Sequence, residues 1–77
     1  MRLAPRDPRS YHNRGLLRGD AADADGAISD FSVAINCDPS YAEAYLGRGC
    51  SLRMKGAKLE ALADFRAFLH FNGSRPP

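Results

Sequence analysis

Apolar and small residues recur along most of the chain at steps of three and four residues, which places them on one face of an α-helix. One such stripe is formed by Ala27, Phe31, Ala34 and Ile35. A second stripe, near the C-terminus, is formed by Ala61, Phe65, Phe68 and Leu69. This spacing predicts an all-α protein whose helices each bury one side.

Turn-forming and helix-capping residues divide the pattern into four helices. Asp7 before Pro8 is typical of an N-cap followed by proline in the first turn. Asp38-Pro39 ends a helix, and the segments 20–26 and 54–58 have the composition of tight turns. The helices are predicted at 8–21, 24–37, 41–54 and 58–71. Three further signals are expected: an N-cap at Asp23, a capping box at Ser40 and Glu43, and a C-cap at Asn72-Gly73.

The chain repeats itself with a period of 34 residues, for example between Tyr11 and Tyr45 (45 − 11 = 34). Each period holds two predicted helices, so the chain is interpreted as one domain, 1–77, of two helix hairpins. Repeat one covers about 8–41 and repeat two about 42–73. Residues 1–5 align with a repeat end and are predicted to be its remnant, and 74–77 form a tail. The identical pairs are Pro5/Pro39, Tyr11/Tyr45, Arg14/Arg48, Gly15/Gly49, Ala27/Ala61, Asp30/Asp64, Phe31/Phe65 and Ser40/Ser74.

This period resembles the tetratricopeptide repeat, in which a large residue, a glycine, an Ala-x-x-x-Phe segment and a proline occupy fixed places. Repeat one carries Tyr11, Gly15, Ala27, Phe31 and Pro39. Repeat two carries Tyr45, Gly49, Ala61 and Phe65, with Gly73 in place of the proline. The resemblance implies antiparallel helix hairpins, two repeats and four helices, stacked as a short right-handed superhelix.

Most of the repeated residues have a structural explanation. Small residues such as Gly15 and Gly49 are expected where helices approach closely, with the phenylalanines and tyrosines filling the space beside them. The charges of Arg14 and Arg48 are expected to pair within the fold with those of Asp30 and Asp64.

The resemblance also implies a concave groove, lined by the first helix of each repeat, that receives peptides. Carried over, the groove residues of repeat one are Arg9, His12, Asn13, Leu16 and Asp20. Those of repeat two are Glu43, Leu46, Gly47, Cys50 and Met54. The mixture of polar and apolar residues suits an extended peptide or a helix. The alternative is that these are solvated residues without a partner of their own.

One subfamily of these repeats binds the carboxylate tails of chaperone partners through lysine, arginine and asparagine. Asn13 matches the asparagine of that clamp, but Glu43 stands where a basic residue is expected. A carboxylate at that position repels a carboxylate ligand. We therefore do not expect an acidic tail to be the ligand.

The last predicted helix carries more apolar residues than one repeat can cover. Phe68 stands where repeat one has Ala34, so it is expected to obstruct the docking of a further repeat. An exposed apolar patch marks an interface more often than a free surface. The sequence therefore predicts a homo-oligomer, with a self-association surface formed by Leu62, Phe68, Leu69 and Phe71.

Composition narrows the classes of function. The net charge of +2 is too small to indicate nucleic-acid binding, and no apolar stretch is long enough for a membrane span. The two cysteines, Cys37 and Cys50, are interpreted as buried or half-buried thiols of a cytoplasmic protein. We expect no cofactor and no metal ion, and no motif indicates an enzyme.

Two functions remain open from the sequence. The first is a protein–protein interaction module, an adaptor or scaffold that binds a partner protein or peptide. The second is a structural self-associating element, or a fragment of a longer repeat protein, with no separate ligand.

Overall fold

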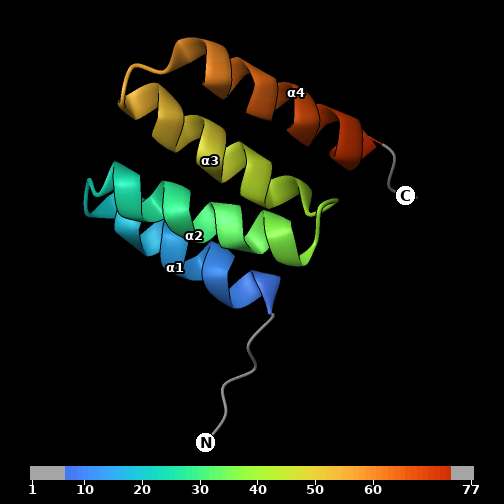
Figure 1. The fold of residues 1–77 in the computed structure, drawn as a ribbon, viewed down its shortest axis with the longest axis horizontal. Helices are drawn as coiled ribbons and strands as arrows, with labels where there is room; N and C mark the ends of the chain where they lie inside the picture. The colour runs from blue at the N-terminus through green and yellow to red at the C-terminus, as the bar shows by residue number, and fades with distance from the viewer. Residues whose placement is uncertain (1–6, 74–77) are drawn as a thin grey trace, which may run out of the picture.

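The computed structural model describes residues 7–73, which form four α-helices joined by short turns (Figure 1). They are α1 (Pro8–Asp20), α2 (Ala24–Cys37), α3 (Ala42–Met54) and α4 (Lys58–Gly73). No residue between 7 and 73 lies in a β-strand. The predicted all-α class and the four helices are confirmed, with each boundary within two residues of the expected one. The predicted remnant at 1–5 and the tail at 74–77 lie outside the described residues.

Two of the predicted helix caps are confirmed. The Asp7 carboxylate accepts a hydrogen bond from the Arg9 backbone N–H at 3.1 Å. Asp23 accepts one from the Gly26 backbone N–H at 3.0 Å. Each carboxylate satisfies a donor that the first turn of its helix leaves without an intrahelical partner.

The predicted caps elsewhere are wrong. The N-cap of α3 is Tyr41, which makes no side-chain capping bond. The Ser40 hydroxyl instead donates to the Asp38 carboxylate at 2.9 Å, so the turn itself uses the group that the capping box required. At the other end, α4 continues through Gly73, so Asn72 and Gly73 belong to the helix and do not cap it.

The helices follow one another in space as they do along the chain, with consecutive helices antiparallel (Figure 1). α1 packs on α2, α2 on α3, and α3 on α4, while α1 also contacts α3. Within residues 7–73, α4 packs against α3 alone, so one side of α4 forms an edge of the molecule. None of the described helices has the length and hydrophobicity needed to cross a lipid bilayer.

The centre of the core is the Phe31 ring, which is only 2% exposed. It lies between glycines of the two flanking helices. A Cβ atom added to Gly15 of α1 would lie 2.8 Å from the ring, and one added to Gly47 of α3 would lie 2.5 Å from it. The second repeat has the same arrangement on one side, with Gly49 at 2.7 Å from the Phe65 ring. The expectation that Gly15 and Gly49 sit at close helix contacts is confirmed.

The expected pairing of the repeated charges is also confirmed. Arg14 binds Asp30 through two hydrogen bonds of 3.0 and 2.9 Å, and Arg48 binds Asp64 through two of 2.8 and 3.0 Å. The hydrogen bonds that Arg48 donates to the Asp64 carboxylate raise the pKa of Arg48, against the opposing effect of burial. Arg48 additionally donates to the Ser32 hydroxyl at 3.1 Å, which ties α3 to α2. Both aspartates are buried, so these bonds satisfy charges that water does not reach.

Candidate functional site: a hollow between α1 and α3

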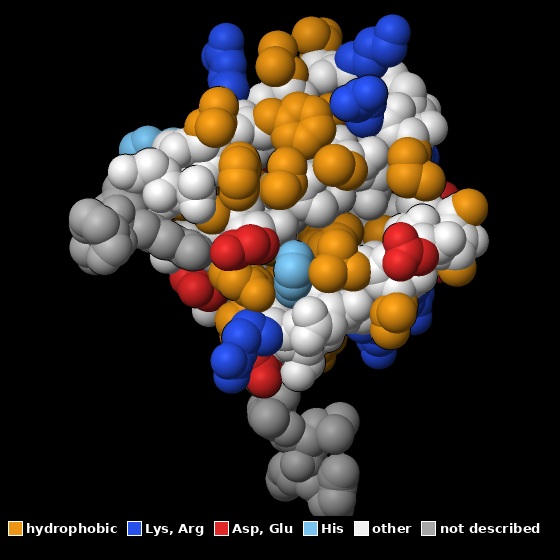
Figure 2. Space-filling model, turned by 180° about the vertical axis from the view of Figure 1, so that it is seen from behind, with side chains coloured by type: hydrophobic (Ala, Val, Ile, Leu, Met, Phe, Trp, Pro, Cys, Tyr) orange, Lys and Arg blue, Asp and Glu red, His pale blue; other side chains and the backbone are white. Residues whose placement is uncertain are grey.

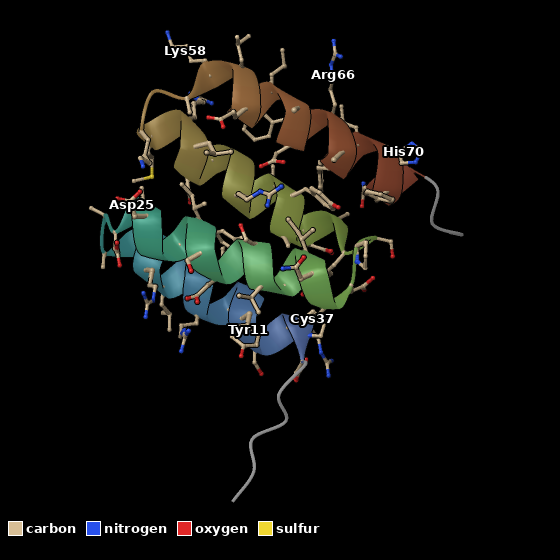
Figure 3. The ribbon with its side chains drawn as sticks, viewed as in Figure 1. Tyr11, Asp25, Cys37, Lys58, Arg66 and His70 are labelled. Atoms are coloured by element: carbon tan, nitrogen blue, oxygen red, sulfur yellow. The ribbon has the colours of Figure 1, made fainter. Side chains whose placement is uncertain are left out.

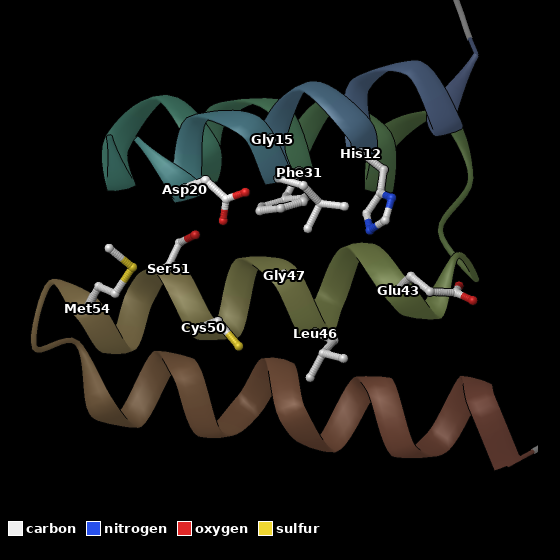
Figure 4. A pocket seen from close by; sticks show the side chains of 12 residues that line it. His12, Gly15, Asp20, Phe31, Glu43, Leu46, Gly47, Cys50, Ser51 and Met54 are labelled. Carbon is white, nitrogen blue, oxygen red and sulfur yellow. The ribbon is translucent and has the colours of Figure 1, made fainter. Parts of the chain in front are cut away.

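A hollow of about 480 Å³ opens between α1 and α3 (Figure 4). Phe31, reaching through from α2, forms part of its lining. Eight of the predicted groove residues are brought together in its lining: His12, Leu16, Asp20, Glu43, Leu46, Gly47, Cys50 and Met54.

Two predicted groove residues are not part of the hollow. Arg9 and Asn13 are both exposed on α1, outside the lining. Arg9 lies near the helix start, where its guanidinium is 3.8 Å from the Asp7 carboxylate. The asparagine that matched the carboxylate clamp is therefore not on the wall of this hollow.

The sequence did not identify Phe31, Gly15, Gly19 and Ser51 as part of the lining. Phe31 and Gly15 were assigned to packing alone. Because Gly15 on α1 and Gly47 on α3 have no side chains, both helix backbones come close to the Phe31 ring, which lines the hollow although it is only 2% exposed. The positions of these glycines were the available signal, but only the packing of both helices shows that the two glycines contact one ring.

The walls of the hollow are mostly apolar and accessible. Leu16 is 46% exposed, Leu46 is 39% exposed and Met54 is 57% exposed. Burial of such side chains by a partner is favourable, since it removes apolar surface from water. Cys50 is exposed here too, so its interpretation as a buried or half-buried thiol is wrong, whereas Cys37 is half-buried. Both are free thiols.

Three polar side chains stand at the ends of the hollow. Asp20 lies at one end, and His12 and Glu43 lie at the other (Figure 4). The His12 ring packs against two aromatic rings, with its centroid 5.6 Å from that of Phe31 and 5.4 Å from that of Tyr41. His12 is thus held as part of the wall.

The chemistry of this arrangement is that of a binding surface: an apolar floor, accessible aliphatic walls and carboxylates at the margins. Figure 2 shows hydrophobic side chains spread over this face of the molecule, with acidic side chains beside its hollowed part. Residues 7–73 contain no group of three or more histidine, cysteine, aspartate or glutamate side chains that could hold a metal ion.

The four residues of the predicted self-association surface on α4 differ in exposure. Leu62 and Leu69 are 50% and 65% exposed, and Phe68 is half-buried. Phe71 is also half-buried and stacks on Tyr45 of α3, with ring centroids 5.3 Å apart. Phe71 therefore contributes to packing within the chain. Leu59, which was not predicted, is 84% exposed on the same helix.

No protein-family model matches this sequence, and no curated protein is significantly similar to it.

Proposed function

We propose that this chain is a protein–protein interaction module of the tetratricopeptide-repeat type, which binds a peptide or helix of a partner protein in the hollow between α1 and α3. The observation that carries the proposal is the accessible apolar hollow built by the first helix of each hairpin. Its role is to hold a partner, with no catalytic step.

Two features support the repeat architecture. The internal period of 34 residues coincides with the helix hairpins, since Gly15 and Gly49 contact Phe31 and Phe65 in the same way. The order of contacts, α1 on α2, α2 on α3 and α3 on α4 with α1 also beside α3, is the one that stacked hairpins require. We propose that the two hairpins form a short right-handed superhelix whose inner face is the hollow.

The size of the hollow fits a weak and reversible complex. Covering the half-exposed side chains of Leu16, Leu46 and Met54 contributes about 1 kcal/mol each. Association also costs translational, rotational and side-chain freedom, which consumes much of such a gain. We therefore expect contacts outside the hollow to add to the affinity of the complete complex.

The proposal is tested by affinity purification with tagged protein and mass spectrometry, comparing wild type with Leu16→Glu. Leu16 lines the hollow, and a carboxylate there is incompatible with an apolar ligand. The matched control is Leu17→Glu, on the same helix, because Leu17 is 69% exposed and does not line the hollow. Partners retained by wild type and Leu17→Glu should be lost with Leu16→Glu. Identical sets from all three proteins would contradict binding in the hollow.

A second candidate function is self-association through α4. The comparison between repeats favours it, because Phe31 is almost fully buried while its counterpart Phe65 is only half-buried. The difference arises because α3 covers α2, whereas no described helix covers the outer side of α4. A second copy of the chain would cover Leu62 and Leu69 in the same way.

A further inference from the structure

We infer that the hollow selects a cationic, apolar peptide, one whose apolar side chains enter over Phe31 while a lysine or arginine pairs with Asp20. This inference rests on the proposed function, and it names the chemical class of the partner.

The charge of the hollow is opposite to that of the whole chain. The whole sequence has 11 lysines and arginines against 9 aspartates and glutamates. Among the charged residues of the described range 7–73, however, only Asp20 and Glu43 line the hollow. Several cations are occupied elsewhere, since Arg14 and Arg18 lie on Asp30 and Arg48 lies on Asp64. Lys58 and Arg66 project from α4 on the side away from α3 (Figure 3). Among residues 7–73, the lining that a ligand meets in the hollow therefore holds carboxylates and no lysine or arginine.

Asp20 differs from every other aspartate of the chain. Each of the other six accepts a hydrogen bond from a backbone N–H, a hydroxyl or a cationic side chain, and these are Asp7, Asp23, Asp25, Asp30, Asp38 and Asp64. Asp20 has no hydrogen bond or ion pair with any residue of the described range 7–73, and it is exposed. Its side chain points into the space between α1 and α3 (Figure 4).

The position of Asp20 does not serve helix stability. It is the last residue of α1, where the backbone carbonyls give the helix a partial negative charge. A carboxylate at that end is unfavourable, and Arg18 in the same turn is directed to Asp30 and Asp23. A cation on the ligand would pair with the Asp20 carboxylate, and it would also offset the repulsion between that carboxylate and the C-terminal end of α1.

The separation of Leu16 and Asp20 also predicts how far apart the apolar side chain and the cation of the ligand lie. Leu16 and Asp20 are four residues apart on α1 and so share a face, with Cβ atoms about 6 Å apart. A ligand that contacts both presents an apolar side chain and a cation at a similar separation. In a helical peptide these residues are three or four positions apart, and in an extended peptide they are two apart. Complementary charge at a rim acts mainly on specificity, because it penalises ligands with the wrong sign.

The test is a selection of random twelve-residue peptides displayed on phage against wild type, Asp20→Asn and Leu16→Glu, with Leu17→Glu as the matched control. Peptides selected on wild type should carry lysine or arginine at these spacings from leucine, isoleucine, methionine or phenylalanine. The best of them, measured by fluorescence anisotropy at low salt, should bind Asp20→Asn about fivefold more weakly than wild type. Replacing the peptide's lysine by glutamine should remove this difference, and high salt should reduce it.

The outcomes separate the two proposals. If the selected peptides are acidic or uncharged, or bind Asp20→Asn as tightly as wild type, the charge selection is overturned, while binding lost only with Leu16→Glu still supports the hollow as a binding site. If no peptide depends on Leu16, both the charge selection and the proposed function fail. Misfolding is controlled by circular dichroism, since the melting temperature of Asp20→Asn should not fall below that of wild type.

Discussion

Phe31 is held between two glycines, and the closer of them is Gly47 on the neighbouring hairpin. A Cβ atom at Gly47 would lie 2.5 Å from a ring that is 2% exposed and that also lies tightly against Gly15 of α1. Overpacking of this kind costs about 1–3 kcal/mol, while alanine gains about 1 kcal/mol of helix propensity over glycine. We expect Gly47→Ala to destabilise the protein by about 1 kcal/mol, measured by thermal unfolding with circular dichroism.

Gly19→Ala provides the control for helix propensity. A Cβ atom at Gly19 would have its nearest neighbour at 4.0 Å, an ordinary van der Waals contact with Ala27. The stability of this variant should stay the same or rise by up to about 1 kcal/mol. If Gly47→Ala were as stable as Gly19→Ala, the tight contact with Phe31 would not be present in solution.

The turns within the two hairpins differ at one residue that needs a left-handed backbone. The first turn has Ala22 with φ 63°, and the equivalent position of the second turn is Gly56 with φ 87°. The left-handed conformation costs alanine about 1–2 kcal/mol, and glycine loses about 0.4–1 kcal/mol through its freer unfolded chain. Ala22→Gly should therefore raise the free energy of unfolding by up to about 1 kcal/mol in urea titrations. Gly56→Ala should lower it, and a change of the same sign in both variants would contradict this account.

At the scale of the helices, the two repeated ion pairs differ in the number of cations that bind the buried aspartate. Asp30 is reached by two cations, Arg14 and Arg18, whereas Asp64 is bound by Arg48 alone among the described residues. Arg48→Ala leaves the buried Asp64 without a donor and also removes the bond to Ser32 between α2 and α3. We expect it to lower the free energy of unfolding by about 2 kcal/mol in urea titrations.

Arg14→Ala is the matched variant for this prediction. Asp30 keeps Arg18, whose guanidinium is 3.2 Å from its carboxylate, so the loss of stability should be clearly smaller than for Arg48→Ala. Equal losses would indicate that Arg18 does not substitute for Arg14.

At the scale of the whole molecule, the outer side of α4 is an edge where the stack of helices ends. Continuing the stack with a second copy in the manner of α2 on α3 would place Asn13 against Phe65, where the chain itself uses Gly47 against Phe31. It would also place Arg14 against Arg66, where Arg48 meets Ser32. A side chain in place of a glycine and a pair of like charges oppose an open head-to-tail filament. We therefore expect self-association through α4, the second function proposed above, to take the form of a closed dimer in which the two α4 helices face each other.

Analytical ultracentrifugation tests this dimer. Wild type should show a concentration-dependent monomer–dimer equilibrium. Leu62 is 50% exposed on α4, and the Leu62→Glu variant should be monomeric because dimerisation would bury the carboxylate introduced at this position. Leu17→Glu, on α1, should behave like wild type. A wild-type monomer at all concentrations, or species larger than a dimer, would exclude this mode of association.

The predicted groove residues that line the hollow share a simple property. Leu16 and Asp20, like Leu46 and Cys50, are four residues apart on one helix, so helical spacing alone places each pair on a common face. Arg9 and Asn13 share the same kind of spacing, yet they lie outside the hollow. Which part of a helix face borders a cavity depends on where the neighbouring helix crosses it, and spacing along one helix does not contain that information.

The sequence alone determined the positions of the helices and their pairing into two similar hairpins. It also determined the ion pairs that recur in each repeat, Arg14 with Asp30 and Arg48 with Asp64. The reason is that caps, turns and the 34-residue period act over short stretches of chain. The tertiary structure alone decided that Phe31 forms the floor of a hollow, that Phe71 is used in packing against Tyr45, and that Asp20 has no partner among the described residues. Each of these depends on contacts between residues far apart in the chain, where the packing of several helices decides which side chains are covered and which remain accessible.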